Sequence, residues 1–167
     1  MVNHKMRIVL LIFLFSCLVS CGFKPMYKFS ENNVDLKSYS INLINESNTS
    51  RQIKEEINKS FPSGSQIEKG YVIDIEVFEN LDPLITNTDG TVSKYRIEII
   101  MYFKVKATNA NEFLINDVAR GFTQYTVETS EIESDDKRKR MVRTATNSAI
   151  QMMISKIQSD TAITNDN

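Results

Sequence analysis

A strictly alternating stretch from Ser93 to Lys106 constrains the fold more than any other part of the sequence. Apolar or aromatic side chains occupy every second position, namely Tyr95, Ile97, Ile99, Met101, Phe103 and Val105. Most of the intervening positions are charged: Lys94, Arg96, Glu98, Lys104 and Lys106. Because successive side chains of a strand point to opposite faces, this pattern predicts a long β-strand with one apolar and one polar face.

Three further segments resemble strands that could pair with this one. Residues 39–44 alternate weakly, residues 71–78 alternate cleanly, and residues 113–127 return the chain after a turn. Residues 80–91 read as a turn region between the second and third strands. Gly121, inside the returning segment, predicts a bend or bulge there.

Two segments carry helical periodicity. Residues 51–61 place Ile53, Ile57 and Phe61 four apart, on one face of a short helix. The final helix is predicted to begin at Ser134, with acidic residues in its first turn. Its apolar stripe follows helical spacing and comprises Val142, Ala145, Thr146, Ala149, Ile150, Met153, Ile154 and Ile157.

These elements predict an α+β fold with the order β-α-β-β-β-α over residues 39–160. Strands joined by short turns pair antiparallel, whereas the first two strands, joined through a helix, pair in parallel. We therefore expect a four-stranded mixed, mostly antiparallel sheet with two helices packed on one face. The opposite face is predicted to be polar or half-polar.

The N-terminus reads as a lipoprotein signal peptide over residues 1–20. A short basic region precedes an unbroken apolar run from Ile8 to Phe15, which suits a secretory signal better than a membrane span. The sequence from Leu18 to Cys21 resembles the bacterial lipobox, in which the Cys sulfur takes up lipid and cleavage then leaves that Cys as the N-terminus. Gly22 favours delivery to the outer membrane. Residues 21–38 are expected to form a lipidated tether, and residues 161–167 a disordered tail.

The inventory of side chains argues against an enzyme. The single histidine is His4, and the two cysteines, Cys17 and Cys21, lie in the N-terminal segment. We therefore expect no catalytic residues, no metal site and no cofactor beyond the lipid on Cys21. A formal net charge of -1 gives no reason to expect nucleic acid as a partner. The densest carboxylate cluster, Asp74, Glu76 and Glu79, is interpreted as a solvated face rather than a cation site or acid–base pair.

Two groups of basic residues are candidate contact sites. The first is the run Lys137, Arg138, Lys139 and Arg140, with Arg143 one turn later. The second, on a sheet face, comprises Lys94, Arg96, Lys104 and Lys106. Both groups suit phosphates of a lipid headgroup or an acidic partner surface. The alternative is a solvated surface, neutralised in the first case by Glu131, Glu133, Asp135 and Asp136.

The heptapeptide from Cys21 to Tyr27, CGFKPMY, resembles the start of LPS-assembly lipoproteins of the LptE family. The Asp89-Gly90 turn and Arg120-Gly121-Phe122 are similar to that family's plan. The resemblance implies a non-enzymatic, lipid-anchored protein of the outer membrane, facing the periplasm. Such proteins plug the β-barrel LptD, assist its assembly and take part in lipopolysaccharide delivery to the outer leaflet. Some relatives carry a basic residue where Asn87 and Thr88 stand here, which leaves Lys94 and Arg96 as substitutes.

Other functions remain open at this stage. One alternative is a generic periplasmic lipoprotein that serves as an auxiliary subunit of a transport complex. Another is a lipid-anchored hydrolase that acts through Asp74 and Glu76. Direct contact with lipopolysaccharide and a purely scaffolding role are both compatible with the sequence.

Overall fold

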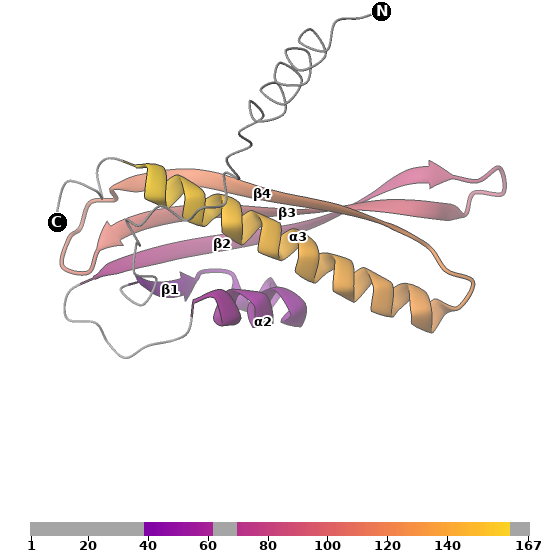
Figure 1. The fold of residues 1–167 in the computed structure, drawn as a ribbon, viewed down its shortest axis with the longest axis horizontal. Helices are drawn as coiled ribbons and strands as arrows, with labels where there is room; N and C mark the ends of the chain where they lie inside the picture. Colours follow the sequence, from indigo (N-terminus) through magenta and orange to yellow (C-terminus); the bar gives the residue numbers. More distant parts are fainter. Residues whose placement is uncertain (1–38, 62–69, 161–167) are drawn as a thin grey trace, which may run out of the picture. The chain divides into compact units, whose positions relative to one another are not determined.

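The alternating stretch forms β3, Val92–Ala107, an inner strand of a four-stranded sheet. The other strands are β1, Tyr39–Leu43, β2, Tyr71–Thr86, and β4, Ile115–Thr126. Their order in the sheet is β1-β2-β3-β4, so every strand lies beside its neighbour in sequence (Figure 1). Short connections between β2, β3 and β4 enforce this order.

The structure is a computed structural model that describes residues 39–61 and 70–160. All of these residues belong to the unit Val34–Asn167. The predicted signal peptide (1–20), tether (21–38) and tail (161–167) lie outside the described residues, as does Cys21.

The sheet is mixed, as predicted. β1 runs parallel to β2, with Tyr39 opposite Tyr71 and Leu43 opposite Ile75. β2 and β3 are antiparallel, and so are β3 and β4. The parallel pair is possible because the chain passes through a helix between β1 and β2, which gives it room to return to the same end of the sheet.

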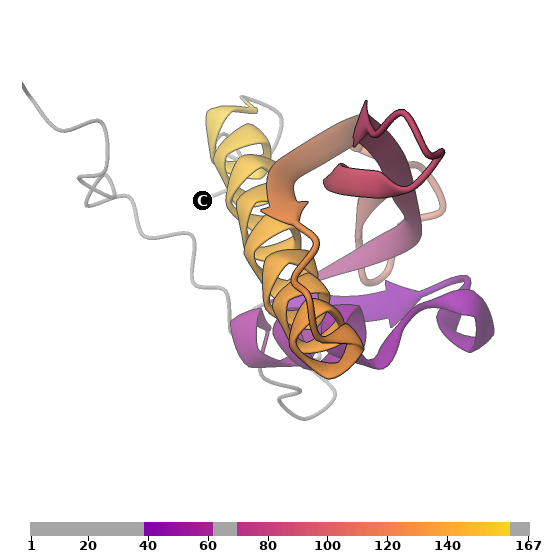
Figure 2. The ribbon, with the colours of Figure 1, turned by 90° about the vertical axis from the view of Figure 1, so that its right-hand side faces the viewer.

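Both helices cover the same face of this sheet (Figure 2). A 3-10 turn, η2, Glu46–Asn48, leads into α2, Arg51–Ser60. The C-terminal helix is α3, Glu131–Ser159, which runs along β4 and β3. The predicted α+β fold, with two helices on one side of a four-stranded mixed sheet, is therefore confirmed.

The core lies between the helices and the inward face of the sheet. Every predicted stripe residue of α3 is buried, from Val142 to Ile157. α2 contributes Ile53 and Ile57. The strands contribute Tyr39, Ile73, Ile75, Val77, Ile97, Ile99, Met101, Phe103, Val105, Ile115, Ala119 and Tyr125. One layer of helix and one layer of sheet thus remove nearly all the apolar stripes from water, which is the main force that holds the fold together.

Gly121 has a different role from the one the sequence indicates. The pairing of β4 with β3 continues without a register shift past Gly121, which lies opposite Ile99, so the predicted bulge is absent from this pairing. A Cβ at Gly121 would stand 1.9 Å from the carbonyl oxygen of Ala145 and 2.7 Å from the backbone nitrogen of Ala149. The glycine is there because the backbone of α3 passes directly over it.

The register shift occurs instead in β2, which is longer than predicted. Residues 80–86, predicted as part of a turn, continue to pair with β3, and the shifts fall between Pro83 and Thr86. The connection between β2 and β3 is confined to residues 87–91, where the amide of Gly90 donates to Asn87 O at 3.0 Å. Gly90 has φ +85°, which only glycine adopts without strain. Pro83 lies at this irregularity, where a proline is tolerated within a strand.

The final helix also begins earlier than predicted. Ser130, not Ser134, occupies the N-cap position, and its hydroxyl accepts a hydrogen bond from the amide of Glu133. The Ser134 hydroxyl instead bonds the backbone of Glu128, accepting from its amide at 2.6 Å and donating to its carbonyl at 3.2 Å. Serine is a favourable N-cap residue at either position, so the choice of Ser134 over Ser130 could not be decided from the sequence alone.

Beyond the end of β1, a side chain continues the hydrogen bonding along β2. The Asn45 amide nitrogen donates to Val77 O at 2.6 Å, and the Asn45 amide oxygen accepts from Val77 N at 3.0 Å. Asn45 therefore satisfies both backbone groups that a longer β1 would have paired.

The contact at Gly121 yields a stability prediction. Replacement of Gly121 by alanine forces α3 away from β4, because the new methyl group meets backbone rather than a movable side chain. We expect the substitution to lower the free energy of unfolding by about 3 kcal/mol or more, measured by urea denaturation.

Gly90→Ala is the matched control. Nothing lies within 4 Å of a Cβ at Gly90, so the cost there is the left-handed backbone alone, about 1–2 kcal/mol. Equal losses for the two variants would contradict the close helix–sheet contact.

Candidate contact surfaces

The basic run on α3 is paired within the protein. Arg138 Nη2 lies 2.8 Å from Glu79 Oε1 of β2. Lys139 Nζ lies 2.6 Å from Asp135 Oδ2, one turn earlier, and Lys137 pairs with Glu128. These ion pairs support the interpretation that the run is a neutralised surface. Two of the neutralising carboxylates are Glu79 and Glu128. The sequence predicted neutralisation by acidic residues near the start of the helix, namely Glu131, Glu133, Asp135 and Asp136.

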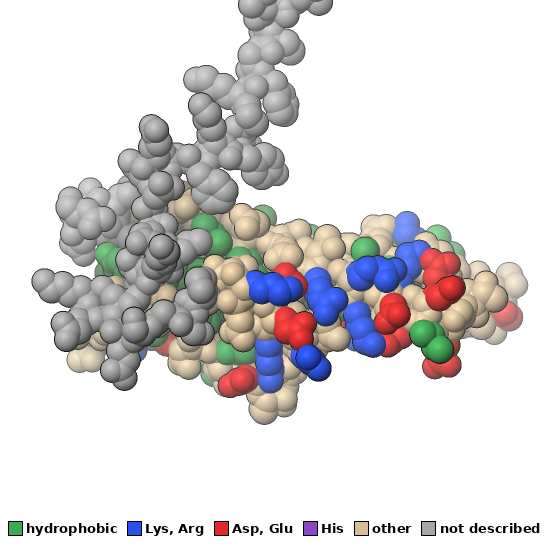
Figure 3. Space-filling model, turned by 60° about the horizontal axis from the view of Figure 1, so that its bottom comes forward, with side chains coloured by type: hydrophobic (Ala, Val, Ile, Leu, Met, Phe, Trp, Pro, Cys, Tyr) green, Lys and Arg blue, Asp and Glu red, His purple; other side chains and the backbone are tan. Residues whose placement is uncertain are grey.

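The next two arginines differ from each other. Arg143 Nη2 lies 3.2 Å from Glu55 Oε2 of α2, and its Nε lies 3.8 Å from Glu56 Oε1. Arg140 is exposed and has no ion pair within the part of the chain that the structure describes. Figure 3 shows this side of the molecule, where Lys and Arg alternate with Asp and Glu rather than form a uniform basic patch.

Glu56 is a buried carboxylate between the two helices. Its side chain accepts hydrogen bonds from Lys59 Nζ at 2.8 Å and from Asn147 Nδ2 of α3 at 3.0 Å. The hydrogen bond from Lys59 is the main reason that the pKa of Glu56 lies below its ordinary value, although burial opposes it. Glu56 thus links α2 to α3 through Asn147, and its lowered pKa favours the ionised carboxylate.

The basic row on the outward face of the sheet is only partly neutralised. Arg96 Nη2 lies 3.3 Å from Asp82 Oδ2. Lys94, Lys104 and Lys106 have no ion pair with any described residue. Lys104 and Lys106 instead place their ammonium groups 5.3 and 5.6 Å from the centroid of the Phe113 ring. The two predicted basic groups thus lie on different sides of the domain and differ in how far they are neutralised.

The structure divides the carboxylate cluster that the sequence suggested. Asp74 and Glu76 face outward, and Asp74 accepts a hydrogen bond from Asn42 Nδ2 at 2.8 Å. Glu79 faces the helices, where it binds Arg138. Across residues 39–61 and 70–160, the His, Cys, Asp and Glu side chains make no group of three or more that could hold a metal ion.

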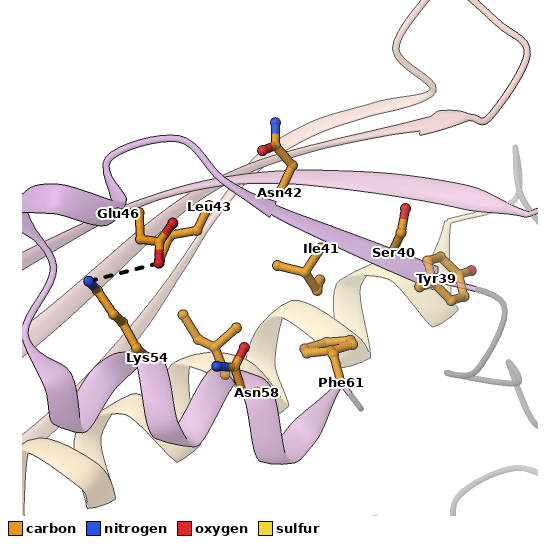
Figure 4. A pocket seen from close by; sticks show the side chains of 10 residues that line it. Tyr39, Ser40, Ile41, Asn42, Leu43, Glu46, Lys54, Asn58 and Phe61 are labelled. Atoms are coloured by element: carbon orange, nitrogen blue, oxygen red, sulfur yellow. Dashed lines mark ion pairs between the residues drawn. The ribbon is translucent and has the colours of Figure 1, made fainter. Parts of the chain in front are cut away.

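A hollow of about 320 Å³ lies between β1 and α2 (Figure 4). Ile41 and Phe61 supply apolar walls, while Lys54 and Glu46 form an ion pair across one end at 4.0 Å. At the other end Tyr39 stacks on Tyr71, with ring centroids 5.3 Å apart. Burial and the neighbouring Tyr71 raise the pKa of Tyr39 to about 12, so its hydroxyl remains protonated at neutral pH. Sequence periodicity gave no sign of this hollow.

Within the described part of the chain, neither helix is long and apolar enough to cross a membrane. Cys21, the predicted lipidation site, lies outside the described residues. It remains a prediction from the lipobox pattern.

Comparison with known proteins identifies the fold. No family model matches the sequence, and no curated protein matches it. Among solved structures, a candidate lipoprotein from Caulobacter crescentus superposes with a TM-score of 0.55 at 12% identity, over 77% of this chain and 90% of that one. A minor lipoprotein from Acinetobacter baumannii superposes with a TM-score of 0.51 at 14% identity, over 73% and 90%.

Rare lipoprotein B from Shewanella oneidensis has a TM-score of 0.46 at 14% identity, over 71% of this chain and 94% of that one. The Caulobacter and Acinetobacter structures share the arrangement of strands and helices described above. The chain therefore has a lipoprotein-like fold.

The buried carboxylate predicts a pH dependence of stability. Because the folded-state pKa of Glu56 is depressed, its contribution is present above the unfolded-state pKa, about 4.3, and is lost as the pH falls through the lower folded-state value. We expect Glu56→Gln to cost about 1–3 kcal/mol at pH 7, measured by urea denaturation. The difference from the native chain should shrink between pH 5 and pH 3.

Glu46→Gln is the control for this effect. Glu46 is exposed and lies at the 4.0 Å limit of its ion pair with Lys54. Its loss is expected to change stability little at either pH. If the cost of Glu56→Gln were constant down to pH 3, the charge of Glu56 would not be what joins the helices.

Proposed function

We propose that this chain is an LptE-type outer-membrane lipoprotein. In this proposal it plugs an LptD-type β-barrel, assists assembly of that barrel and takes part in lipopolysaccharide delivery to the outer leaflet. The observation that carries the proposal is the stretch from Leu18 to Tyr27, which joins a lipobox to CGFKPMY, on a chain with a lipoprotein-like fold. The anchor would hold the domain at the periplasmic side of the membrane.

The proposed role is non-enzymatic. His4, the single histidine, and both cysteines lie in the segment that signal processing would remove or lipidate. Many charged side chains of the folded domain are engaged with one another, such as Arg138 with Glu79 and Lys156 with Asp117, rather than arranged around a reacting group. A surface of closely interleaved charges suits contact with the polar lumen of a barrel.

Copurification tests the partner. Affinity isolation of the mature lipidated chain from detergent-solubilised envelopes is expected to recover a large β-barrel protein in stoichiometric amount, identified by mass spectrometry. Recovery of an inner-membrane ATPase complex instead would favour the alternative, an auxiliary subunit of a transport complex. Isolation of the chain alone would refute both assignments.

The anchor is tested separately at Cys21. Cys21→Ser removes the sulfur that takes up lipid, and cleavage depends on that lipid. We expect the variant to retain residues 1–20 and to lose its acyl mass, both read by mass spectrometry of the membrane fraction.

Cys17→Ser is the matched control, because it changes a cysteine in the same segment that does not follow the lipobox pattern. It should be processed and acylated like the native chain. Normal processing of Cys21→Ser would exclude the lipobox interpretation.

A further inference from the structure

The open side of β1 offers unused backbone groups. β1 is at the edge of the sheet, and β2 is the only described strand that pairs with it. Just beyond its end, the Ile44 amide donates to Ile75 O at 2.9 Å. Because the direction of backbone groups alternates along a strand, those of Tyr39, Ile41 and Leu43 point away from β2. An extended segment that lies along this side therefore meets N–H and C=O groups to which it can bond.

The hollow between β1 and α2 lies beside this edge. Ile41 and Phe61 lie in the space between the two elements, whereas Ser40 and Asn42 point away from it (Figure 4). Ile73 of β2 is fully buried, but Ile41, directly opposite it, is only partly buried. The volume of about 320 Å³ is about ten times the space that one water occupies in the liquid, so a large side chain fits. The apolar layer beneath α2 is thus incomplete at this edge.

A cation and a carboxylate stand at one end of the hollow. Lys54 of α2 and Glu46 of η2 line it near Leu43, and their charged groups are 4.0 Å apart (Figure 4). The Glu46 side chain is 71% exposed, and ion pairs screened by water in this way contribute little to stability. A second carboxylate can therefore approach the Lys54 ammonium at low cost.

We propose that this edge binds an extended segment of a partner polypeptide, which adds to β1 as an antiparallel strand. In strand additions of this kind, main-chain hydrogen bonds supply affinity and pockets for alternate side chains supply specificity. A large apolar side chain opposite Ile41 enters the hollow. The position opposite Leu43, two residues earlier in an antiparallel segment, lies near Lys54 and takes an acidic side chain. The expected pattern is an acidic residue, any residue and then a large apolar residue.

Two other occupants fit the edge less well. A second copy would pair the five residues of its β1 with the same five here, which buries far less than the roughly 800 Å² per partner of a stable interface. It would also place Tyr39, not an acidic side chain, opposite Leu43. The strands of a closed barrel pair with one another and leave no edge to add, so the occupant is a loop or a terminus. The inference goes beyond the proposed barrel-plug role and does not depend on it.

Fluorescence anisotropy with the full mature chain and a labelled synthetic peptide tests this inference. The probe is the heptapeptide TETFTVT with both ends blocked, whose Glu and Phe occupy the positions opposite Leu43 and Ile41. We expect saturable binding. Exchange of the Glu for Lys, or of the Phe for Ser, in the probe is expected to weaken binding about tenfold.

N-methylation of the probe distinguishes strand addition from simple apolar contact. In the proposed pairing the Phe amide donates to the Ile41 carbonyl, so N-methylation of that amide should weaken binding at least about tenfold. The next Thr directs its amide away from β1. N-methylation at that Thr is therefore the matched control and should leave the affinity near that of the unmodified probe.

Three variants of the protein locate the site. Asn58→Trp fills the hollow from α2 and should abolish binding. Lys54→Gln should remove the preference for Glu over Lys in the probe. Arg51→Gln is the matched control, because Arg51 is an exposed cation of the same helix outside the lining of the hollow, and it should bind like the native chain. Circular dichroism checks that each variant is folded.

Absence of binding by the probe would overturn the inference, as would equal weakening by the two N-methyl derivatives or equal effects of Lys54→Gln and Arg51→Gln. Dimers of the chain, detected by light scattering and lost in Asn58→Trp, would assign the edge to a second copy and would also overturn it. Copurification of a barrel can succeed or fail in each of these cases, so failure of the strand-addition site and failure of the proposed function are distinguishable.

Discussion

The close approach of α3 to β4 is the constraint on which the remaining packing depends. Ala145 and Ala149 of the helix lie against Gly121 of the strand, where there is no room for a side chain. At one end of α3, Lys156 Nζ binds Asp117 and the carbonyl of Val118, each at 2.8 Å. At the other end, Arg138 binds Glu79. Contact at the middle and ion pairs toward the ends set the position and direction of α3 across the sheet. In that position the apolar stripe of α3, from Val142 to Ile157, is buried against the strands.

Sequence periodicity predicted the fold well because the apolar faces are nearly uninterrupted. The apolar side chains of β3 recur at every second position and those of α3 at helical spacing. In each case only one type of secondary structure places them all on a single face that can be buried. Errors arose where a residue has two common roles. A bend or bulge was predicted at Gly121 because glycine in a strand often marks one. The register shows no bulge there, and the absent side chain instead leaves room for the backbone of α3. Residues 80–86 were predicted to belong to a turn region, but β2 continues through Pro83 with a register shift.

The candidate sites were harder to predict, because their properties depend on partners distant in sequence. The run from Lys137 to Arg140 is conspicuous in the sequence, yet Glu79 reaches it from β2. Lys104 and Lys106 belong to a basic row that the sequence predicts, but only the folded sheet shows that both ammonium groups converge on Phe113. The edge-to-face contact of Phe78 with Tyr102 joins two strands, so no short window of sequence contains it. The sequence identifies the positively charged side chains, but only the tertiary structure shows which of them form ion pairs within the protein.

Asn45 has a consequence for how the domain behaves in isolation. An open strand edge invites a second chain to add to it and begin a fibril or a swapped dimer. Along β2 that edge is shielded first by β1 and then by the Asn45 amide, which occupies both Val77 groups. Pro83, six residues further on, has no amide hydrogen to offer. Between these two residues only a short run of β2 backbone remains for self-recognition. Among the described strands, the longer open edge is that of β4, which pairs with β3 alone, so copies of the domain that join through backbone would do so there rather than along β2.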